Sequence, residues 1–219
     1  MAVLFRWLEE RMEAQSLADD ALSKYVPPHV GLFFCLGGIV VMAIAAQFAT
    51  GLLLTFYFAP TVVDACASVA LLELSADGAW LARSLHRWAS NFVLLAMLLH
   101  LSRVYLTGGF KKPRELAWIS GAFLALLALA FGVSGYSLPW DQLGFWALQI
   151  VSAVPETADD VLPAAGLGIV FSIRGGFSVG QETLSRARTA HTLALPAGVT
   201  IIALFHFLLI RKQGVSGPL

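Results

Sequence analysis

Three long stretches of the chain contain no charged residue, and each is long enough to cross a lipid bilayer as a helix. A hydrocarbon core of ~30 Å requires about 20 apolar residues in helical form. A fourth stretch, "SLHRWASNFVLLAMLLHLSR", is nearly as apolar, and the arginines toward its two ends can keep their charge outside the membrane. The pattern therefore predicts four membrane-spanning helices, at about 32–59, 80–104, 115–140 and 186–211.

Two shorter apolar runs lie between the third and fourth predicted spans, at 143–154 and 161–173. They are too short to cross the bilayer, so we expect helices at the membrane interface. Residues 1–31 are amphipathic, carry both signs of charge and lack the pattern of a secretory signal, which predicts an N-terminal surface helix. The chain is thus expected to form a single all-α integral membrane domain, residues 1–219, with a four-helix bundle.

Composition supports lipid as the surroundings of this chain. Hydrophobic residues make up 58% of it and charged residues 13%, whereas soluble domains usually carry about 25% charged residues. The net charge is zero, so no basic surface is available for nucleic acid and no such partner is expected. Two cysteines, Cys35 and Cys66, do not provide a disulfide framework.

The distribution of positive charge predicts how the chain is oriented. Four spans place both termini on one side, together with the loop between the second and third spans. That side carries nine lysines and arginines: Arg6, Arg11, Lys24, Arg103, Lys111, Lys112, Arg114, Arg211 and Lys212. The other side carries five: Arg83, Arg87, Arg174, Arg186 and Arg188. The positive-inside rule places the first side, here the n side, in the cytoplasm or stroma, opposite the p side.

Histidines occur at two depths in the second and fourth spans. His86 and His100 are fourteen residues apart, and His191 and His206 are fifteen apart. These spans run in the same direction, so one histidine of each lies toward the p side and one toward the n side. Fourteen residues rise ~21 Å and return to within about 40° of the starting face, and fifteen to within about 60°. Each pair can therefore clamp one metal centre; alternatively, the four histidines hydrogen-bond between helices.

The first and third spans supply glycines at the same spacing. Gly37 and Gly51 are fourteen residues apart, as are Gly121 and Gly135. Glycine lets another body approach the backbone, although small residues also serve ordinary helix packing. Glycine pairs in step with histidine pairs predict a planar macrocycle at each level, and bis-histidine ligation suits a haem that transfers electrons. Arginines at the membrane edges can reach haem propionates, or they can anchor the helices.

The chain also resembles the cytochrome b6 family, the N-terminal half of a split cytochrome b in the cytochrome b6f complexes of oxygenic photosynthesis. The similarity covers nearly the whole chain. It is carried by "SKYVPPHV", "CLGGI", "TFYFAPTV", "RSLHRW", "RVYLTGGFKKPREL", "SGYSLPWDQ", "GFSVGQETL" and "IRKQGVSGPL". The fifteen-residue step between the last two histidines also matches this family. Because the sequence ends where the family's short form ends, we expect it to be complete.

The resemblance implies specific cofactor contacts. Axial ligands would be His86 and His191 for a p-side b haem, and His100 and His206 for an n-side b haem. Residues implied to pack against the haems or to lie near their propionates are Gly37, Gly51, Gly121, Gly135, Arg83, Arg87 and Arg103. Cys35 matches a cysteine that forms one thioether bond to a third haem, which has no amino-acid axial ligand. Asp20 and Arg211 match positions linked to n-side proton uptake.

The resemblance implies a subunit of a plastoquinol–plastocyanin (or cytochrome c) oxidoreductase, active only within its complex. Quinol would be oxidised on the p side, against one wall within residues 138–154. One electron would pass to a Rieske iron–sulfur protein and the other through the b haems to an n-side quinone. Implied partners are the C-terminal cytochrome b half (subunit IV), the Rieske protein, cytochrome f and small subunits. The expected assembly is a homodimer in a thylakoid or photosynthetic plasma membrane, with chlorophyll a and carotenoid.

Three other interpretations stay open at this point. The chain could be the split cytochrome b of a non-photosynthetic menaquinol bc complex, a dihaem membrane anchor of a dehydrogenase, or a haem-free channel or scaffold. Residues 157–176 depart from the family pattern and are longer than usual, which leaves the local p-side contacts open. The sequence assigns no role to Cys66.

Overall fold

The computed structural model describes residue 28 and residues 30–74, 78–160 and 165–214. Every regular element within these residues is a helix, which confirms the predicted all-α class. In chain order they are η1 (Leu32–Cys35), α3 (Leu36–Leu54), α4 (Ala65–Leu74), α5 (Ala79–Leu106), α6 (Glu115–Ser137), α7 (Gln142–Ala153), η2 (Val154–Asp160), α8 (Ala165–Arg174), α9 (Gln181–Thr189), η3 (Ala190–Ala194) and α10 (Leu195–Gln213). The predicted N-terminal surface helix, including Asp20, lies outside the described residues.

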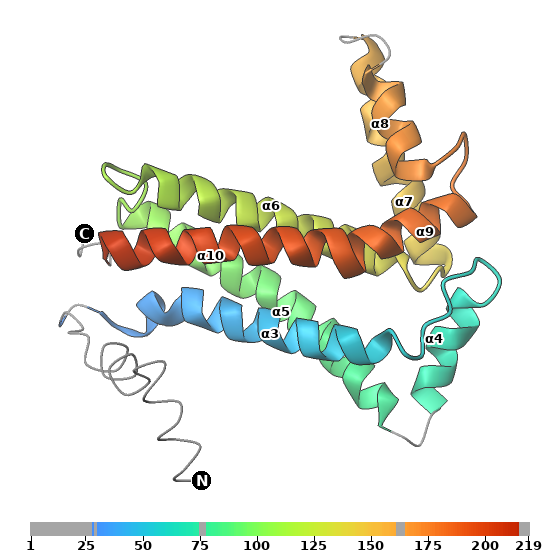
Figure 1. Ribbon diagram of the computed structural model, residues 1–219, viewed down its shortest axis with the longest axis horizontal. Helices are drawn as coiled ribbons and strands as arrows, with labels where there is room; N and C mark the ends of the chain where they lie inside the picture. Colours follow the sequence, from blue (N-terminus) through green and yellow to red (C-terminus); the bar gives the residue numbers. More distant parts are fainter. Residues whose placement is uncertain (1–27, 29, 75–77, 161–164, 215–219) are drawn as a thin grey trace, which may run out of the picture.

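Four long apolar helices form a bundle, as the sequence predicts. They comprise Leu32–Leu54, Ala79–Leu106, Glu115–Ser137 and Gln181–Gln213, the last running through α9, η3 and α10. Figure 1 shows these helices extending along the long axis of the molecule. In the described part of the chain, close backbone packing joins α3 to α5 and α6 to α10, with less between α5 and α6. Each histidine-bearing helix is therefore backed by a glycine-bearing helix.

The helix ends differ from the predicted span limits. α3 ends at Leu54 instead of residue 59; Pro60 disfavours helical conformation in Ala59, the residue before it. α6 ends at Ser137, ahead of the turn in which Trp140 adopts a left-handed φ of 53°. The fourth span begins earlier than predicted, at Gln181, and is 33 residues long.

Short helices gather at the p-side end of the bundle. Figure 1 shows α7 and α8 outside the four long helices, which agrees with the predicted interfacial helices between the third and fourth spans. The ten-residue helix α4, between the first and second spans, is an addition that the sequence pattern did not indicate. It is apolar but too short to cross a bilayer.

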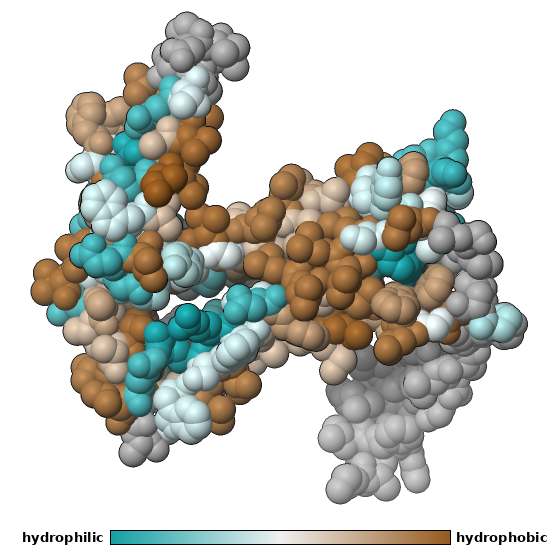
Figure 2. All heavy atoms as spheres, turned by 180° about the vertical axis from the view of Figure 1, so that it is seen from behind, coloured by the Kyte–Doolittle hydropathy of each residue, from teal (hydrophilic) through white to brown (hydrophobic). Residues whose placement is uncertain are grey.

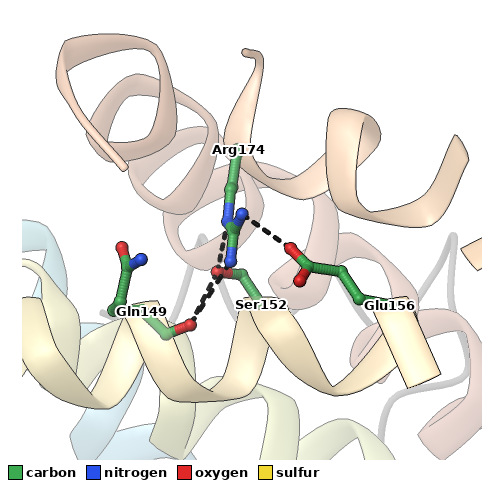
Figure 3. A network of polar contacts seen from close by, with 4 residues as sticks. All are labelled: Gln149, Ser152, Glu156 and Arg174. Carbon is green, nitrogen blue, oxygen red and sulfur yellow. Dashed lines mark hydrogen bonds and ion pairs between the residues drawn. The ribbon is translucent and has the colours of Figure 1, made fainter. Parts of the chain in front are cut away.

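A buried arginine holds α7, η2 and α8 together (Figure 3). Arg174 Nε donates to the Ser152 hydroxyl at 2.8 Å, and its Nη1 donates to the Glu156 carboxylate at 2.9 Å. Its Nη2 donates to the Gln149 carbonyl at 3.5 Å. The Thr183 hydroxyl donates to the Arg174 carbonyl at 2.8 Å, which attaches α9 to the same cluster. These partners offset the cost of burying the guanidinium charge.

Large apolar side chains cover much of the outside of the bundle. Large hydrophobic side chains such as Met42, Leu126 and Leu208 are exposed along the long helices, and Figure 2 shows apolar residues covering the middle of the bundle. Buried positions between the helices are often small, as at Ala96 and Ala117. Small residues at helix contacts and apolar residues facing outward are the arrangement expected of a bundle surrounded by lipid.

Candidate functional site

Each of the four histidines in the spans rests against one glycine of a neighbouring helix. The pairs are Gly51 with His86, Gly37 with His100, Gly135 with His191, and Gly121 with His206. A Cβ atom on the glycine would lie 3.1 Å from the ring Cε1 in three pairs and 2.6 Å from it in the Gly135 pair. A larger residue would crowd the imidazole, so the close approach explains why these positions are glycine.

The histidines meet across the bundle at the two predicted levels. At the p-side level, the ring centres of His86 and His191 are 6.3 Å apart, with their planes inclined by 70°. Two imidazoles that bind one metal from opposite sides, through bonds of about 2.1 Å, have ring centres roughly 6 Å apart. At the n-side level, His206 lies within electrostatic range of His100. The p-side spacing therefore fits a single metal centre between two rings.

A histidine pair supplies only two ligands, so such a metal needs further ligands from elsewhere. Within the described ranges, no group of three or more His, Cys, Asp or Glu side chains could hold a metal ion. A planar macrocycle between the two rings would supply the missing four ligands. The residues present therefore fit a six-coordinate b haem better than a metal bound by protein alone.

Three of the four histidines bond a hydroxyl through Nδ1. The pairs are Thr50 with His86 (2.9 Å), Ser134 with His191 (3.0 Å) and Ser120 with His206 (2.8 Å). Each hydroxyl donates its own hydrogen to a carbonyl of its helix, at 2.7–3.0 Å. Its oxygen therefore accepts from Nδ1–H, which leaves the Nε2 lone pair free for a metal. These hydroxyl residues were not predicted from the sequence, although each directly precedes one of the four glycines.

The fourth span contains one π-helical turn, η3, which includes the p-side histidine. The Leu195 N–H bonds the carbonyl of Ala190, five residues earlier. The next residue, Pro196, has no N–H, and its ring would clash with the carbonyl four residues earlier in a regular α-helix. A π turn accommodates one extra residue. The fifteen-residue step from His191 to His206 therefore comes into register, and the offset of about 60° expected for a regular helix does not arise.

The p-side arginines line a polar cavity. Arg83 forms an ion pair with Glu73 of α4. Both side chains, with Arg87 and Asn91, border a cavity of ≈290 Å³. Two guanidinium groups on one cavity wall can bind an anionic group of a cofactor. Contact of Arg83 and Arg87 with a haem propionate stays a prediction.

The n-side residues gather near the start of α3. Cys35 is exposed and lies two residues before Gly37, which faces the n-side histidine of α5. The Arg103 guanidinium lies 4.2 Å from the centre of the Phe34 ring. Arg211 is in the last turn of α10. The covalent haem at Cys35, the propionate contact of Arg103 and the proton-uptake role of Arg211 stay predictions.

The segment expected to form a quinol-site wall contains an aromatic cavity of ≈310 Å³. Its lining residues are Trp140, Asp141, Gln142, Phe145 and Trp146. The Asp141 carboxylate accepts from the Gly144 N–H at 2.7 Å and so caps α7. The Gln142 side-chain oxygen accepts from Trp146 Nε1 at 3.0 Å. Flat aromatic walls with a few polar groups suit a planar ring ligand.

Comparisons with known proteins agree with this geometry. The family model described as "Cytochrome b/b6/petB" matches residues 21–214. Cytochrome b6 of Heterocapsa triquetra and of Mastigocladus laminosus are each 56% identical to this chain, and cytochrome b6 of Porphyra purpurea is 53% identical. Each of these matches covers 219 residues, all of this chain and all of the relative.

A solved structure of a hyperthermophilic respiratory complex III has the same fold. It superposes with a TM-score of 0.92 and 27% sequence identity over 97% of this chain. This chain spans 56% of the matched chain. The structural similarity therefore covers nearly all of the present molecule and little more than half of its counterpart.

Proposed function

Because this chain belongs to the cytochrome b/b6 family, we propose that it carries electrons across a membrane as the b6-type subunit of a quinol oxidoreductase complex of the cytochrome b6f class. Family membership rests on the model match over residues 21–214 and on full-length relatives 53–56% identical. The observation that carries the proposed role is the facing pair His86 and His191, with ring centres 6.3 Å apart and each ring on a glycine.

The four histidines would hold two haems in series through the thickness of the membrane. His86 and His191 would bind the p-side haem, and His100 and His206 the n-side haem, each through Nε2. Bound haem supplies a one-electron carrier at each level, which the side chains alone do not offer. The glycines give each imidazole room to reach the metal position, and the hydroxyls hold three of the rings in the tautomer that binds metal.

Charged and thiol groups at the membrane edges would complete the sites. Arg83 and Arg87 would turn toward the p-side propionates, and Arg103 toward the n-side propionates. Cys35 would attach a third haem through one thioether bond; its exposed position near the n-side level supports this. For Asp20 and Arg211, a role in proton uptake rests on the family resemblance alone.

The substrate would be plastoquinol, oxidised on the p side where the aromatic cavity of residues 140–146 lies. The second half of a cytochrome b would come from a separate subunit IV, as the resemblance to the cytochrome b6 family implies. A Rieske protein, cytochrome f and small subunits would complete a homodimer that also holds chlorophyll a and carotenoid. Identity of 53–56% to cytochrome b6 against 27% to the respiratory structure favours the photosynthetic form over a menaquinol bc complex.

The proposed location is a thylakoid or photosynthetic plasma membrane. Four helices are long and apolar enough to cross it. The charge distribution of the sequence supports the placement of both termini on the cytoplasmic or stromal side.

A haem count on the purified complex tests the proposal. We expect acid–acetone to extract two b haems per chain, and a haem-stained denaturing gel to show one haem retained on a band near 23.5 kDa. Absence of extractable haem would contradict the electron-transfer role. An unstained band would remove only the attachment at Cys35. The His100→Ala variant should lose the n-side haem alone, and retention of both b haems would contradict the ligand assignment.

A further inference from the structure

The bundle consists of two halves, and each half contributes one histidine to each level. The first half is made of α3, α4 and α5 and carries His86 and His100; the second is made of α6 to α10 and carries His191 and His206. The glycine behind each ring, and the hydroxyl that bonds three of the rings, come from the same half as the histidine. The spacing within each histidine pair therefore depends on how the two halves are held together.

The helices of the two halves come together mainly at one end of the bundle. In the described part of the chain, backbone packing between the halves joins α5 to α6. These two helices follow one another in the chain and are connected by the n-side loop of residues 107–114. Figure 1 shows α5 diverging from α6 toward the p side. The p-side pair therefore depends more than the n-side pair on contacts between the halves outside these helices.

Gln181, the first residue of α9, provides such a contact at the p side. Its side-chain oxygen accepts from the Val62 N–H at 2.9 Å, and its Nε2 donates to the Pro60 carbonyl at 3.0 Å. Both partners lie in the loop between α3 and α4, in the other half. The same Nε2 donates to the Ser185 hydroxyl at 3.1 Å, one turn along α9. The amide group thus uses its oxygen and both of its N–H hydrogens, which fixes the orientation of the side chain.

The loop between α3 and α4 is itself held in one conformation. The Thr61 hydroxyl donates to the Asp64 carboxylate at 2.7 Å and accepts from the Asp64 N–H at 3.0 Å. The Ala59 N–H donates to the Ser68 hydroxyl at 3.2 Å, and the ring of Pro60 restricts its φ. A contact with this loop therefore also restrains the end of α3 that precedes it.

We infer that Gln181 is a positioning residue of the p-side site, which sets the spacing and relative tilt of His86 and His191. The restrained end of α3 carries Gly51, against which His86 rests. Gln181 itself begins the fourth span, which continues to His191. The two hydrogen bonds from Gln181 to the loop thus connect the two supports of the p-side pair. The inference rests on the proposed function, because its readout requires that the histidines bind haem.

Four variants of the complex separate these hydrogen bonds. Gln181→Met keeps the length of the side chain and removes both bonds to the loop. Gln181→Glu keeps the acceptor for the Val62 N–H and removes the donor to the Pro60 carbonyl. Ser185→Ala removes the bond within α9 and leaves both bonds to the loop. Ser172→Ala is the control, because its hydroxyl is exposed on the p side and bonds the Gly168 carbonyl of its own helix, at 2.8 Å.

Two measurements on the purified complex report on the p-side pair. The low-temperature EPR signal of an oxidised bis-histidine haem depends on the angle between its imidazole planes, which is 70° for His86 and His191. Gln181→Met should shift or broaden the p-side signal and leave the n-side signal unchanged. Capture of released haem by apomyoglobin should be roughly 5- to 160-fold faster for the p-side haem, the factor that corresponds to two lost hydrogen bonds. Gln181→Glu should have a smaller effect, Ser185→Ala a slight one and Ser172→Ala none.

Two results would overturn the inference while leaving the proposed function intact. One is a p-side signal and a rate of haem loss that are both unchanged in Gln181→Met. The other is equal acceleration of haem loss at both levels, which would indicate general loosening of the bundle. If Gln181→Met fails to assemble, a p-side shift in Gln181→Glu that exceeds the shift in Ser185→Ala supports the inference, and equal shifts overturn it. Absence of b haem from the unmodified complex would instead overturn the proposed function, and the inference with it.

Discussion

Each of the four histidines in the spans fits against its neighbouring helix because the residue that it faces is a glycine, which has no side chain. The closest approach is at Gly135, where a Cβ would lie 2.6 Å from Cε1 and 3.2 Å from both ring nitrogens of His191. On the same helix, Gly132 has nothing within 4 Å of an added Cβ. Helix α6 therefore offers a required glycine and an unconstrained one within one turn.

We predict that Gly135→Ala loses the p-side haem and that Gly132→Ala does not. The added methyl group must push His191 away from the metal position, and overpacking of this kind costs about 1–3 kcal/mol. The haem affinity of that site should fall roughly 5- to 160-fold, and its occupancy should fall below that of the n-side site. Reduced-minus-oxidised difference spectra with a haem count measure it, and the n-side haem serves as the internal reference. A fully occupied p-side haem in Gly135→Ala would contradict the role of this glycine.

At the scale of the helices, α5 and the fourth span both place two histidines beside a pair of glycines. The two helices differ in the number of residues between their histidines. α5 is α-helical from Ala79 to Leu106 and places its histidines fourteen residues apart. The fourth span has fifteen residues between its histidines and places the extra one in η3. Both helices consequently present histidines to glycine pairs that are fourteen residues apart.

Deletion of a single residue should have opposite effects in these two helices. In a Pro196→Ala background, which removes the ring that would clash in a regular α-helix, deletion of Leu193 removes the extra residue of η3. A regular α-helix with a fourteen-residue step should then form, and both b haems should remain. Deletion of Leu95 from α5 rotates one histidine by about 100° and shifts it by about 1.5 Å relative to the other. That variant should lose at least one b haem. Both side chains are exposed, at 66% and 57%, so the deletions are matched. Equal haem loss in the two variants would contradict the compensating role of the π turn.

The Arg174 side chain bonds to residues of both α7 and η2, so it braces these elements against α8. Arg174→Leu should leave the Ser152 hydroxyl and the Glu156 carboxylate without this partner. Glu156 is 46% exposed on its side chain and can be solvated, so we expect a loss of about 1–3 kcal/mol, below the roughly 3–5 kcal/mol of a fully buried pair. Hydrogen exchange of the complex should show faster opening of α7 and α8. Glu156→Gln keeps an acceptor and should have a smaller effect; unchanged protection in Arg174→Leu would refute the bracing role.

At the scale of the whole molecule, the features set by the thickness of the bilayer or by the helical repeat were predictable from the sequence. The four spans follow from uncharged runs, and the two levels of histidine and glycine follow from steps of fourteen or fifteen residues. Features that depend on one tertiary contact were not predictable. The Thr50 hydroxyl is informative only once His86 is known to lie beside it, and Arg174 looks like a loop charge until Ser152 and Glu156 surround it.

The positions at which helices begin and end were only partly predictable from the sequence. Pro60 indicates from the sequence alone that the first helix cannot include residue 59. Helix α4 is different, because its apolar residues are too few to indicate a span and its fixed position depends on contacts such as the Glu73–Arg83 ion pair with α5. The extra residue between His191 and His206 was visible in the sequence, but its absorption by a π turn was not.

Because four helices are expected to cross the membrane, the side on which each loop lies can be predicted and tested without measuring the haems. Cys66 lies in α4, between the first and second spans, and is exposed. Lys111 lies in the loop between the second and third spans and is also exposed. A single span separates them, so the two positions must lie on opposite sides of the membrane. In closed vesicles with the n side outward, a membrane-impermeant maleimide should label a Lys111→Cys variant at position 111 at once.

Cys66 should react in the same vesicles only after detergent opens them, and peptide mass spectrometry distinguishes the two sites and Cys35. The unmodified chain controls for the introduced thiol, and Cys66→Ser controls for the native one. Because α5 is the only element that could reverse the side between residues 66 and 111 in the described part of the chain, labelling of both positions from one side would mean that α5 does not cross. His86 and His100 on α5 would then not lie at different depths in the membrane. The proposed transfer of electrons from one face of the membrane to the other would lose its support.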